Sequence, residues 1–395
     1  MKNVGIVAEF NPFHQGHNRL ISLTRKRFGE SCAVICCMSG HFVQRGEPAF
    51  LDKWKRAALS LAGGADLILE LPTPCAAASA QRFARGAVGL LSATGLVDVL
   101  AFGSESGDLA ALQALEQSLE SEPYQAALRT ALDRGAPFAV ARAEALFACA
   151  GDAARCLDGP NDTLGVEYLS ALRYWGSSME VMAVQRTMGR HDAPVGNGVV
   201  SASAIRTLLR AGETEAAFAL MPEGCRPLME DAVLSDWGLC ERAVLARLRG
   251  MAEEDFLTLP DCGEGLHRRL MAAAEQAATL PELLELAKTK RYTAARIRRA
   301  VLWAFLGLRQ KDIPEKPPYI RVLGFNQRGR AVLRQMQETA TPPVLTRASQ
   351  VRELGGTAEA LMRMESRCTD LYALTLPQPF PCGREWREGP VVIDK

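Results

Sequence analysis

The sequence predicts an α/β protein built on a doubly wound parallel sheet, with a mainly helical C-terminal domain. Two observations lead to this fold class. The first two hundred residues contain five short apolar segments rich in Val, Ile and Leu, a composition typical of buried parallel strands. Helical patterns separate these segments, and a chain that alternates strands with helices folds into a parallel sheet covered on both faces.

The expected elements follow in order along the chain. Strands are predicted for residues 4–8, 33–38, 66–71, 97–102 and 180–185, and helices for residues 17–28, 53–62, 76–93 and 161–175. An alanine-rich helical insertion is expected between about residues 108 and 150.

The pattern of hydrophobic residues changes after about residue 216, where helical periodicity dominates. Gly212, Pro222 and Gly224 cluster there, so we expect two domains, at residues 1–215 and 216–395. Within the second domain, residues 319–333 predict a strand, a turn and the start of a helix. The Pro/Gly-rich tail, residues 376–395, is expected to wrap the surface.

Composition points to an ordinary globular protein, with 48% hydrophobic and 23% charged residues among 395. Apolar runs are too short to span a bilayer, and the N-terminal segment lacks the pattern of a signal peptide. The eleven cysteines are scattered and form no CxxC pair, which fits reduced thiols and disfavours a zinc ribbon. We therefore expect a cytoplasmic protein with no membrane partner, no structural metal and no disulfide.

Charge is unevenly distributed, although the net charge is only +1. Between residues 288 and 334 the chain carries thirteen basic residues against two acidic ones, which indicates a nucleic-acid partner. The expected contacts to an RNA stem are Lys290, Arg291, Tyr292, Arg296, Arg298 and Arg299, and those to an anticodon loop are Arg321, Asn326, Gln327 and Arg328.

A histidine pair follows the first expected strand, in the stretch FHQGH. Polar residues at a helix start often serve only as caps, and zinc ligation is a second possibility that lacks an evident third ligand. Phosphate binding is favoured, because helix N-termini present free N–H groups and Gly16 allows close approach. His14 and His17 can then donate hydrogen bonds to phosphate oxygens.

A second anion site is predicted from SASAIR, which follows the fifth expected strand. Ser201 or Ser203 can cap a helix here, and Arg206 lies on its next turn. Two such sites in the first domain suit a polyphosphate. Lys53 and Arg56, at the start of the helix after the second strand, are further candidate phosphate contacts.

HxGH and SxSxIR together resemble the nucleotidylyltransferase superfamily, in which HxGH and ISSTxIR motifs hold ATP while its α-phosphate is attacked. Longer segments are similar to the bacterial tRNA(Met) cytidine acetate ligase family: VGIVAEFNPFHQGH, GHFVQRGEPAFLDKWKRA, GADLILELP, FGSE, GPNDTLGVEYLSAL, RYTAARIRRAVL and YIRVLGFNQRG. They run from Val4 to Gly329. One departure is His41, where the family more often has asparagine.

The resemblance implies a nucleotidylyltransferase-like Rossmann fold and a set of ATP-binding residues. These are Val7, Ala8, Glu9, Phe10, Asn11, Pro12, Phe13, His14, Gln15, Gly16, His17, Asn18, Arg19, Leu20, Gly103, Asn161, Arg186, Thr187, Ser201 and Ser203. His14, His17, Lys53 and Arg206 are the expected catalytic residues.

The resemblance also implies an ATP-dependent ligase that acts in two steps. Acetate attacks the α-phosphate of ATP, which is accompanied by Mg²⁺, to give acetyl-adenylate and pyrophosphate. The wobble cytidine in the anticodon arm of elongator tRNA(Met) then takes the acetyl group on N4.

Two other functions stay open at this point. One is a metabolic nucleotidylyltransferase that adenylates a small phosphate ester, which would not need the basic segment. The other is a non-catalytic RNA-binding protein with a degenerate nucleotide fold. The sequence makes no prediction of oligomeric state.

Overall fold

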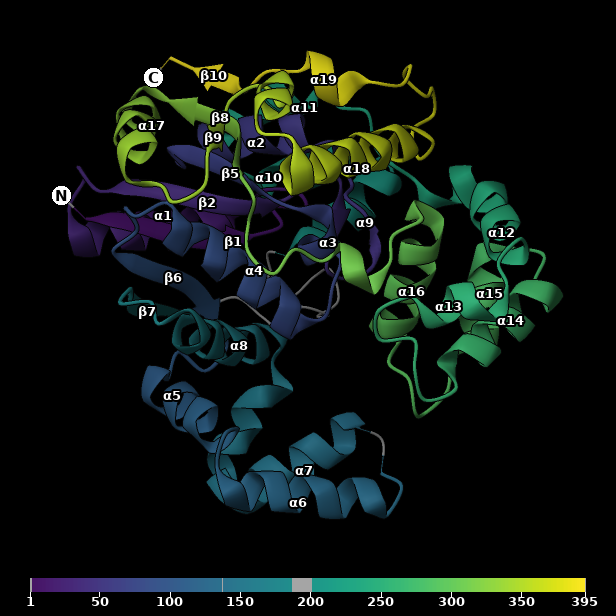
Figure 1. The fold of residues 1–395 in the computed structure, drawn as a ribbon. Helices are drawn as coiled ribbons and strands as arrows, with labels where there is room; N and C mark the ends of the chain where they lie inside the picture. Colours follow the sequence, from purple (N-terminus) through teal and green to yellow (C-terminus); the bar gives the residue numbers. More distant parts are fainter. Residues whose placement is uncertain (1, 137, 187–200, 395) are drawn as a thin grey trace.

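An eight-stranded sheet forms the centre of the molecule (Figure 1). The computed structural model describes residues 2–136, 138–186 and 201–394. Five parallel strands make the main part of the sheet: β1 (Asn3–Ala8), β2 (Ala33–Ser39), β5 (Leu67–Leu71), β6 (Val99–Ser104) and β7 (Glu180–Gln185). These are the five predicted strands, with ends that differ by no more than two residues, so the predicted fold class is confirmed.

The order of strands, β10-β8-β5-β2-β1-β6-β7, reverses at β1. From β1 the chain moves outward through β2 to β5, and then returns to add β6 and β7 on the other side of β1. In such a sheet, ligands bind at the carboxyl ends of the strands where the order reverses. The expected binding edge is therefore the end of β1 and β6.

Helices cover both faces of the sheet, as a doubly wound fold requires. The helices beside the sheet are α1 (Gln15–Phe28), α2 (Lys53–Ala62), α3 (Thr73–Ala76), α4 (Ala80–Ala93), α8 (Pro160–Trp175), α9 (Ala202–Arg210), α10 (Thr214–Ala219), α11 (Arg226–Met229) and α17 (Gln327–Thr339). The single helix predicted for residues 76–93 is in fact two, α3 and α4.

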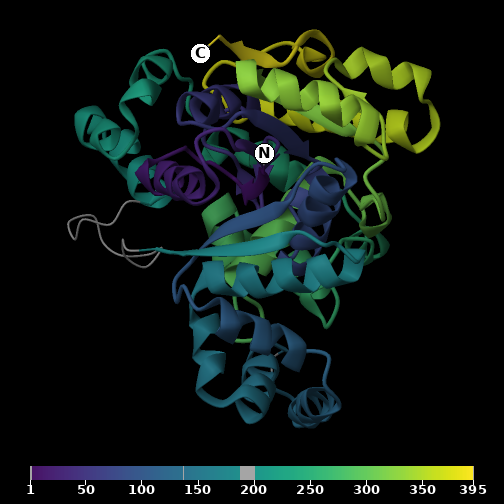
Figure 2. The same cartoon turned by 90° about the vertical axis from the view of Figure 1, so that its left-hand side faces the viewer.

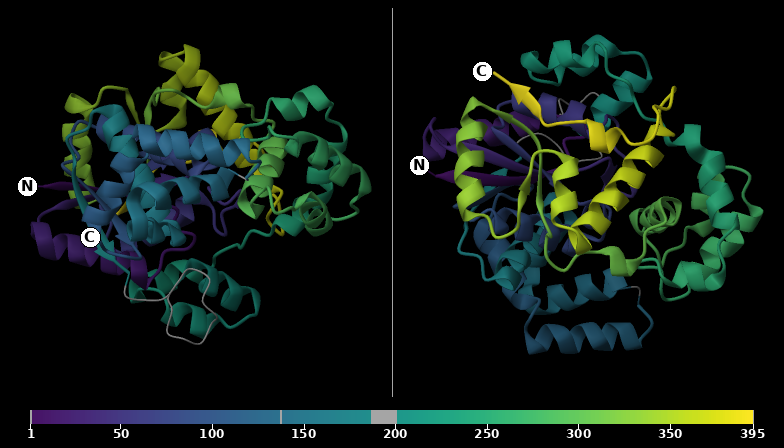
Figure 3. Two further views of the ribbon diagram at one scale, coloured as in Figure 1. Left: turned by 90° about the horizontal axis from the view of Figure 1, so that it is seen from below. Right: turned by 45° about the horizontal axis from the view of Figure 1, so that its top comes forward.

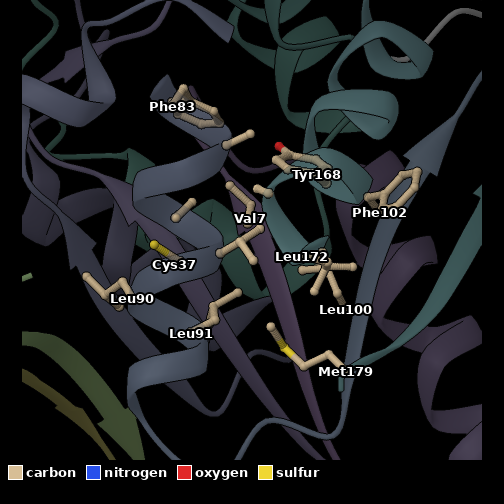
Figure 4. Close-up of a cluster of buried hydrophobic side chains, with 14 of the residues drawn as sticks. Val7, Cys37, Phe83, Leu90, Leu91, Leu100, Phe102, Tyr168, Leu172 and Met179 are labelled. Carbon is tan, nitrogen blue, oxygen red and sulfur yellow. The ribbon is translucent and has the colours of Figure 1, made fainter. Parts of the chain in front are cut away.

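The core follows from the alternation of side chains along the strands. Val7 and Leu100 pack on one face with Leu91 of α4 and Leu172 of α8 (Figure 4). Ile6 and its even-numbered neighbours pack on the opposite face, against α1, α2 and α9. Burial on both faces explains why the strands read as continuous apolar runs.

The insertion after β6 is helical, as predicted. It comprises α5 (Leu109–Ser118), α6 (Glu122–Asp133), α7 (Phe138–Ala150) and a 3₁₀ helix (Gly151–Asp158). Helices α6 and α7 lie at one end of the molecule, in both of the first two views (Figures 1 and 2).

The second half of the chain begins with a helical bundle that has its own core. Its helices are α12 (Glu241–Arg249), α13 (Glu253–Leu257), α14 (Leu266–Gln276), α15 (Leu280–Ala287) and α16 (Ala294–Leu306). Trp303 of α16 anchors the bundle to the first half, because its indole N–H donates to the carbonyl of Ala77 over 2.6 Å.

After the bundle the chain returns to the main sheet. Strand β8 (Ile320–Asn326) pairs antiparallel with β5, and β9 (Val344–Leu345) and β10 (Val391–Ile393) pair parallel with β8. The domain division at residue 215 stays a prediction, and the sheet itself continues across it. The turn predicted after β8 is absent, since Asn326 ends the strand and caps α17 directly.

The C-terminal tail does more than wrap the surface, which corrects that prediction. It contains α19 (Arg384–Arg387), which lies beside α18 (Gly356–Ala373), and it ends in β10 at the edge of the sheet (Figure 3). Glu385 of α19 is fully buried. The tail's polar composition gave no sign of this, because the buried carboxylate is neutralised by residues far away in sequence.

The eleven cysteines are free thiols in the structure, and Cys382 is the one that is exposed. Among the helices in the described ranges, none has the length and apolar character to cross a membrane. The described residues also contain no group of three or more His, Cys, Asp or Glu side chains placed to hold a metal ion.

Candidate active site

A cavity of about 380 Å³ opens at the binding edge predicted from the strand order. Its walls come from the ends of β1, β6 and β7, the first turns of α1, α8 and α9, and residues 44–47. Motifs that lie far apart in the sequence therefore meet around one space.

Helix α1 begins at this cavity with its two histidines arranged as a reciprocal cap. His14 is the N-cap residue, and its Nδ1 accepts a hydrogen bond from the N–H of Gly16 at 3.0 Å. The Nδ1 of His17 accepts in turn from the N–H of His14 at 3.2 Å, and the two rings stack with centroids 3.7 Å apart.

This cap determines the tautomer of both rings. A ring nitrogen that accepts a hydrogen bond carries no proton, so the proton of each neutral imidazole resides on Nε2. Both rings line the cavity. The pair thus places two Nε2–H groups at a helix N-terminus, where a phosphate group is favoured.

Gly16 is required here for a reason that the sequence alone did not give. A Cβ at this position would lie 2.8 Å from Cε1 of the His14 ring. Any side chain would therefore displace the capping histidine, in addition to blocking a ligand's approach to the backbone.

The predicted ATP loop divides into residues that line the cavity and residues that support it. Those in the wall are Val7, Ala8, Glu9, Phe10, Asn11, His14, Gly16, His17, Arg19 and Leu20. Pro12, Phe13, Gln15 and Asn18 lie outside the wall, and their assignment as ATP contacts stays a prediction. The side chain of Gln15 donates to the carbonyl of Met221, and that of Asn18 to the carbonyl of Gly63.

The SASAIR motif contributes Ser201 and Arg206 to the wall, as predicted, but not Ser203. Ser201 caps α9 through the N–H of Ala204. The guanidinium of Arg206 donates to the carbonyl of Asn11 over 2.8 Å, so it ties α9 to the loop after β1. Burial lowers the pKa of Arg206, and Glu47, 3.8 Å away, opposes this shift.

Gly103, Asn161 and Arg186 also line the cavity, as the resemblance implied. Thr187 lies outside the described residues. The first turn of α8 is held by Glu105, a residue that no pattern in the sequence marks as part of a site. Its carboxylate accepts from the backbone N–H groups of Asn161 and Asp162, at 3.2 and 2.8 Å.

Several other residues of the wall were given no role in the cavity from the sequence. Arg45 and Glu47 reach the cavity from the hairpin of β3 (Phe42–Val43) and β4 (Glu47–Pro48), and Phe83 and Tyr168 add an apolar wall. Burial raises the pKa of Glu9, although its carboxylate accepts from the N–H of Gln44 at 2.7 Å. The short hairpin strands are below the length that hydrophobic patterning can detect.

The wall has an excess of positive charge. The four arginines are Arg19, Arg45, Arg186 and Arg206, and the two carboxylates are Glu9 and Glu47. Cations and helix N-termini around a partly apolar space are suited to a triphosphate.

Lys53 does not reach this cavity, and its prediction as a phosphate contact was wrong. Its ammonium is fully buried, 2.6 Å from a carboxylate oxygen of Glu70 and 2.6 Å from one of Glu385. The β3–β4 hairpin separates α2 from the end of β2, so the first turn of α2 meets the C-terminal elements instead. Arg56 is also buried, and it supports the ATP loop by donating to the carbonyl of Glu9.

His41 belongs to the same buried region, not to the cavity. Its ring packs against Trp54 and Tyr372, and its Nδ1 lies 3.2 Å from the hydroxyl of Thr369. Burial and the nearby Lys53 hold the pKa of His41 well below its usual range, so the ring is neutral. The exchange of the family's usual asparagine for histidine is therefore a change in the core.

Glu365 gives this region a testable dependence on pH. Burial, with Glu70 nearby, raises its pKa from 4.5 to about 8. The folded state then binds a proton that the unfolded state has lost, so the group's contribution to stability falls as the pH rises from about 5 to about 8. We expect Glu365→Gln to gain stability relative to the parent protein over this window, measured by urea unfolding at several pH values. A constant difference would contradict the assignment.

The expected RNA contacts are partly engaged within the protein. Arg296 donates to the carbonyl of Asp261, and Arg299 lies 4.0 Å from the carboxylate of Asp261. Arg321 is buried beside Glu385, which corrects its placement at an anticodon loop. Asn326 is likewise structural, since it caps α17.

Other basic residues remain available. Five cations between residues 288 and 334 are exposed and make no ion pair within the described residues. They are Lys290, Arg291, Lys311, Lys316 and Arg334. Arg328 lies 3.4 Å from Asp66, and Gln327 is exposed at the start of α17.

Arg298 connects the helical bundle to the cavity. Its Nε donates to the carbonyl of Arg45 over 3.1 Å, and Gly46 packs so closely on α16 that a Cβ would lie 2.4 Å from the backbone nitrogen of Arg299. Arg298 therefore positions the hairpin that supplies Arg45 and Glu47 to the wall.

We expect Arg298→Ala to raise the KM for ATP about two- to tenfold, which corresponds to the loss of one hydrogen bond. Steady-state kinetics would test this, with Arg268→Ala, an exposed pair with Glu253 on the same bundle, as the control. An unchanged KM would show that the hairpin holds its position without Arg298.

The chain matches a known protein family over most of its length. The model of the HIGH Nucleotidyl Transferase family matches residues 1–383. A tRNA(Met) cytidine acetate ligase of Syntrophotalea carbinolica is 40% identical over 95% of both chains, and one of Acetivibrio thermocellus is 32% identical over 100% of both.

Solved structures extend the similarity to three dimensions. The apo structure of Thermotoga maritima TmcAL superposes with a TM-score of 0.93 at 31% identity, and covers 100% of both chains. The same protein bound with alpha-thio ATP gives a TM-score of 0.92 at 30% identity, again over 100% of both chains.

Proposed function

The chain belongs to the HIGH nucleotidyl transferase family, among its tRNA(Met) cytidine acetate ligases, and on this premise we propose that it activates acetate with ATP and acetylates N4 of the wobble cytidine of tRNA(Met). The observation that carries the proposal is the cavity at the end of β1. There the capped histidine pair, Ser201 and Arg206 come together from opposite ends of the first half of the chain.

The first step is in-line attack of an acetate oxygen on the α-phosphorus of ATP. The new P–O bond gives acetyl-adenylate, and the bond to the β-phosphate breaks to release pyrophosphate. His14 and His17 donate from Nε2 to phosphate oxygens, and Arg206 balances the charge that develops on the leaving group. Mg²⁺, if it is brought in with ATP, would offset part of the negative charge of the phosphates, since the described residues contain no group of three or more His, Cys, Asp or Glu side chains placed to hold it.

The second step joins the acetyl group to the RNA. The exocyclic amine of cytidine attacks the carbonyl carbon of acetyl-adenylate, AMP leaves, and the amine loses a proton. No covalent intermediate on the protein is needed, since positioning and charge stabilisation serve both steps. Phe83 and Tyr168 form an apolar wall that limits the access of water to the reactive anhydride.

The RNA is bound by the basic second half of the chain, on its exposed cations. Such contacts act mainly through phosphates, so binding weakens as salt is raised. The protein works in the cytoplasm, where its ATP, acetate and tRNA are found together.

A substrate panel in the ATP–pyrophosphate exchange assay tests the first step. Exchange that requires acetate, with none on phosphopantetheine or nicotinamide mononucleotide, is the expected result. Exchange driven by a phosphate ester in place of acetate would instead identify a metabolic nucleotidylyltransferase.

A further inference from the structure

A second cavity lies beside α4, on a different face of this helix from the ATP cavity. Its volume is about 250 Å³, and none of its lining residues is shared with the first. Ala80 and Phe83 of α4 line the ATP cavity, whereas Arg82 and Arg85 line the second one. Neither step of the proposed reaction makes use of this space.

The wall of the second cavity combines aromatic rings with an arginine stacked on one of them. Cζ of Arg85 lies 4.3 Å from the ring centroid of Tyr174, and the indole N–H of Trp175 donates to the carbonyl of Arg85 over 2.8 Å. Tyr174 is 50% exposed, so part of this surface is open to a ligand. Aromatic rings and guanidinium planes are the surfaces on which unpaired bases stack.

The charges around this cavity also favour a phosphorylated ligand. Arg82 and Arg85 make no ion pair with any residue in the described ranges, and Nε of Arg85 is buried there without a hydrogen-bond partner. A ligand would therefore meet the Nη groups of this guanidinium, which are not among the buried unpartnered donors. Glu315 is the one carboxylate among the lining residues.

The opposite wall belongs to the basic segment that indicated RNA binding in the sequence. Residues 310–317 supply it, and Lys311 and Lys316 are exposed in this stretch. Two of the five unengaged cations, Lys311 and Lys316, therefore belong to the stretch that forms this wall, whereas Arg321 is buried in the core.

We propose that this second cavity binds a single unpaired nucleotide of the RNA, with its base stacked at Tyr174 and Arg85 and its phosphate held by Arg82. The volume admits about one nucleoside and excludes a duplex. The inference rests on the proposed function for the identity of the RNA, and it adds a subsite outside the catalytic cavity that would help to hold the tRNA in place.

Binding of tRNA in the absence of ATP tests this subsite. The affinity of fluorescently labelled tRNA(Met) transcript is measured by anisotropy for Tyr174→Ala and Arg82→Ala. Phe147→Ala and Arg129→Ala, an exposed aromatic and an exposed arginine of the helical insertion, are matched controls. Acetate-dependent pyrophosphate exchange without RNA is measured on every variant.

Both cavity variants are expected to weaken tRNA binding about tenfold, as loss of one stacked base or of one phosphate contact does, with unchanged exchange. The controls should bind within about twofold of the parent. Unchanged tRNA affinity in both cavity variants would overturn the proposal. AMP binding is measured as well. If Tyr174→Ala lost AMP binding but kept its tRNA affinity, the cavity would serve a free nucleotide, and the proposal would be overturned.

Failure of the proposed function has a different signature. A parent protein that binds tRNA(Met) but forms no acetylcytidine would contradict the ligase activity. Weakened tRNA binding by Tyr174→Ala would still support the nucleotide subsite in that case.

Discussion

His17→Asn is expected to lower acetate-dependent pyrophosphate exchange by about two to three orders of magnitude, the usual cost of removing one donor that stabilises charge in a transition state. The asparagine side chain can still present an oxygen to the N–H of His14, where Nδ1 of His17 accepts at 3.2 Å. It does not reach the position of Nε2. The substitution therefore keeps the cap of α1 and removes the donor.

The comparison with other variants makes this experiment specific. His17→Ala removes both the cap and the donor, and loss of a cap alone costs about 1 kcal/mol of stability. His267→Ala is the control, because His267 lies in the helical bundle and pairs with Glu253. This variant should catalyse acetate-dependent pyrophosphate exchange at the parent's rate. Full exchange by His17→Asn would mean that the imidazole serves only as a cap.

Lys53→Met is expected to destabilise the folded state by about 3–5 kcal/mol, because it removes the cation that two buried carboxylates share and leaves only Arg321, 3.9 Å from Glu385, near them. Glu70 and Glu385 both contact the ammonium, and Glu385 comes from the C-terminal tail. The ion pairs thus join the start of α2, strand β5 and α19. Urea unfolding followed by circular dichroism gives the free energy of unfolding.

The neighbouring Lys55 is the matched control. It lies on the same helix and pairs with Asp231, whose side chain is 80% exposed, so Lys55→Met should cost no more than about 1 kcal/mol. If Lys53→Met unfolded at the parent's urea concentration but lost pyrophosphate exchange, the buried structural role would be refuted in favour of a phosphate contact.

The sheet and the histidine pair could be predicted from sequence because the signals are local. Continuous apolar runs mark strands buried on both faces, and His14, Gly16 and His17 occupy one turn at a helix start. The end of β6 and the start of α9 could be assigned to the same site because parallel strands bring their carboxyl ends to one edge.

The partners of buried charges could not be predicted in this way. In the sequence, Lys53 is a polar residue at the start of a helix that follows a strand. A residue that binds phosphate has the same pattern. Glu385, the partner of Lys53, lies more than three hundred residues away, in a tail whose composition suggested a surface strap. Arg321 was misplaced for the same reason, since a basic residue in a basic segment reads as exposed.

Transfer of labelled acetate to RNA tests the central claim most directly. The parent protein is incubated with tRNA(Met) transcript, ATP and isotopically labelled acetate, and the RNA is digested and analysed by mass spectrometry. We expect labelled N4-acetylcytidine at the wobble position, formed only when ATP is present, and a large loss of it with His17→Asn. The account would be contradicted if the tRNA stayed unmodified although the parent protein formed AMP and pyrophosphate from ATP and acetate.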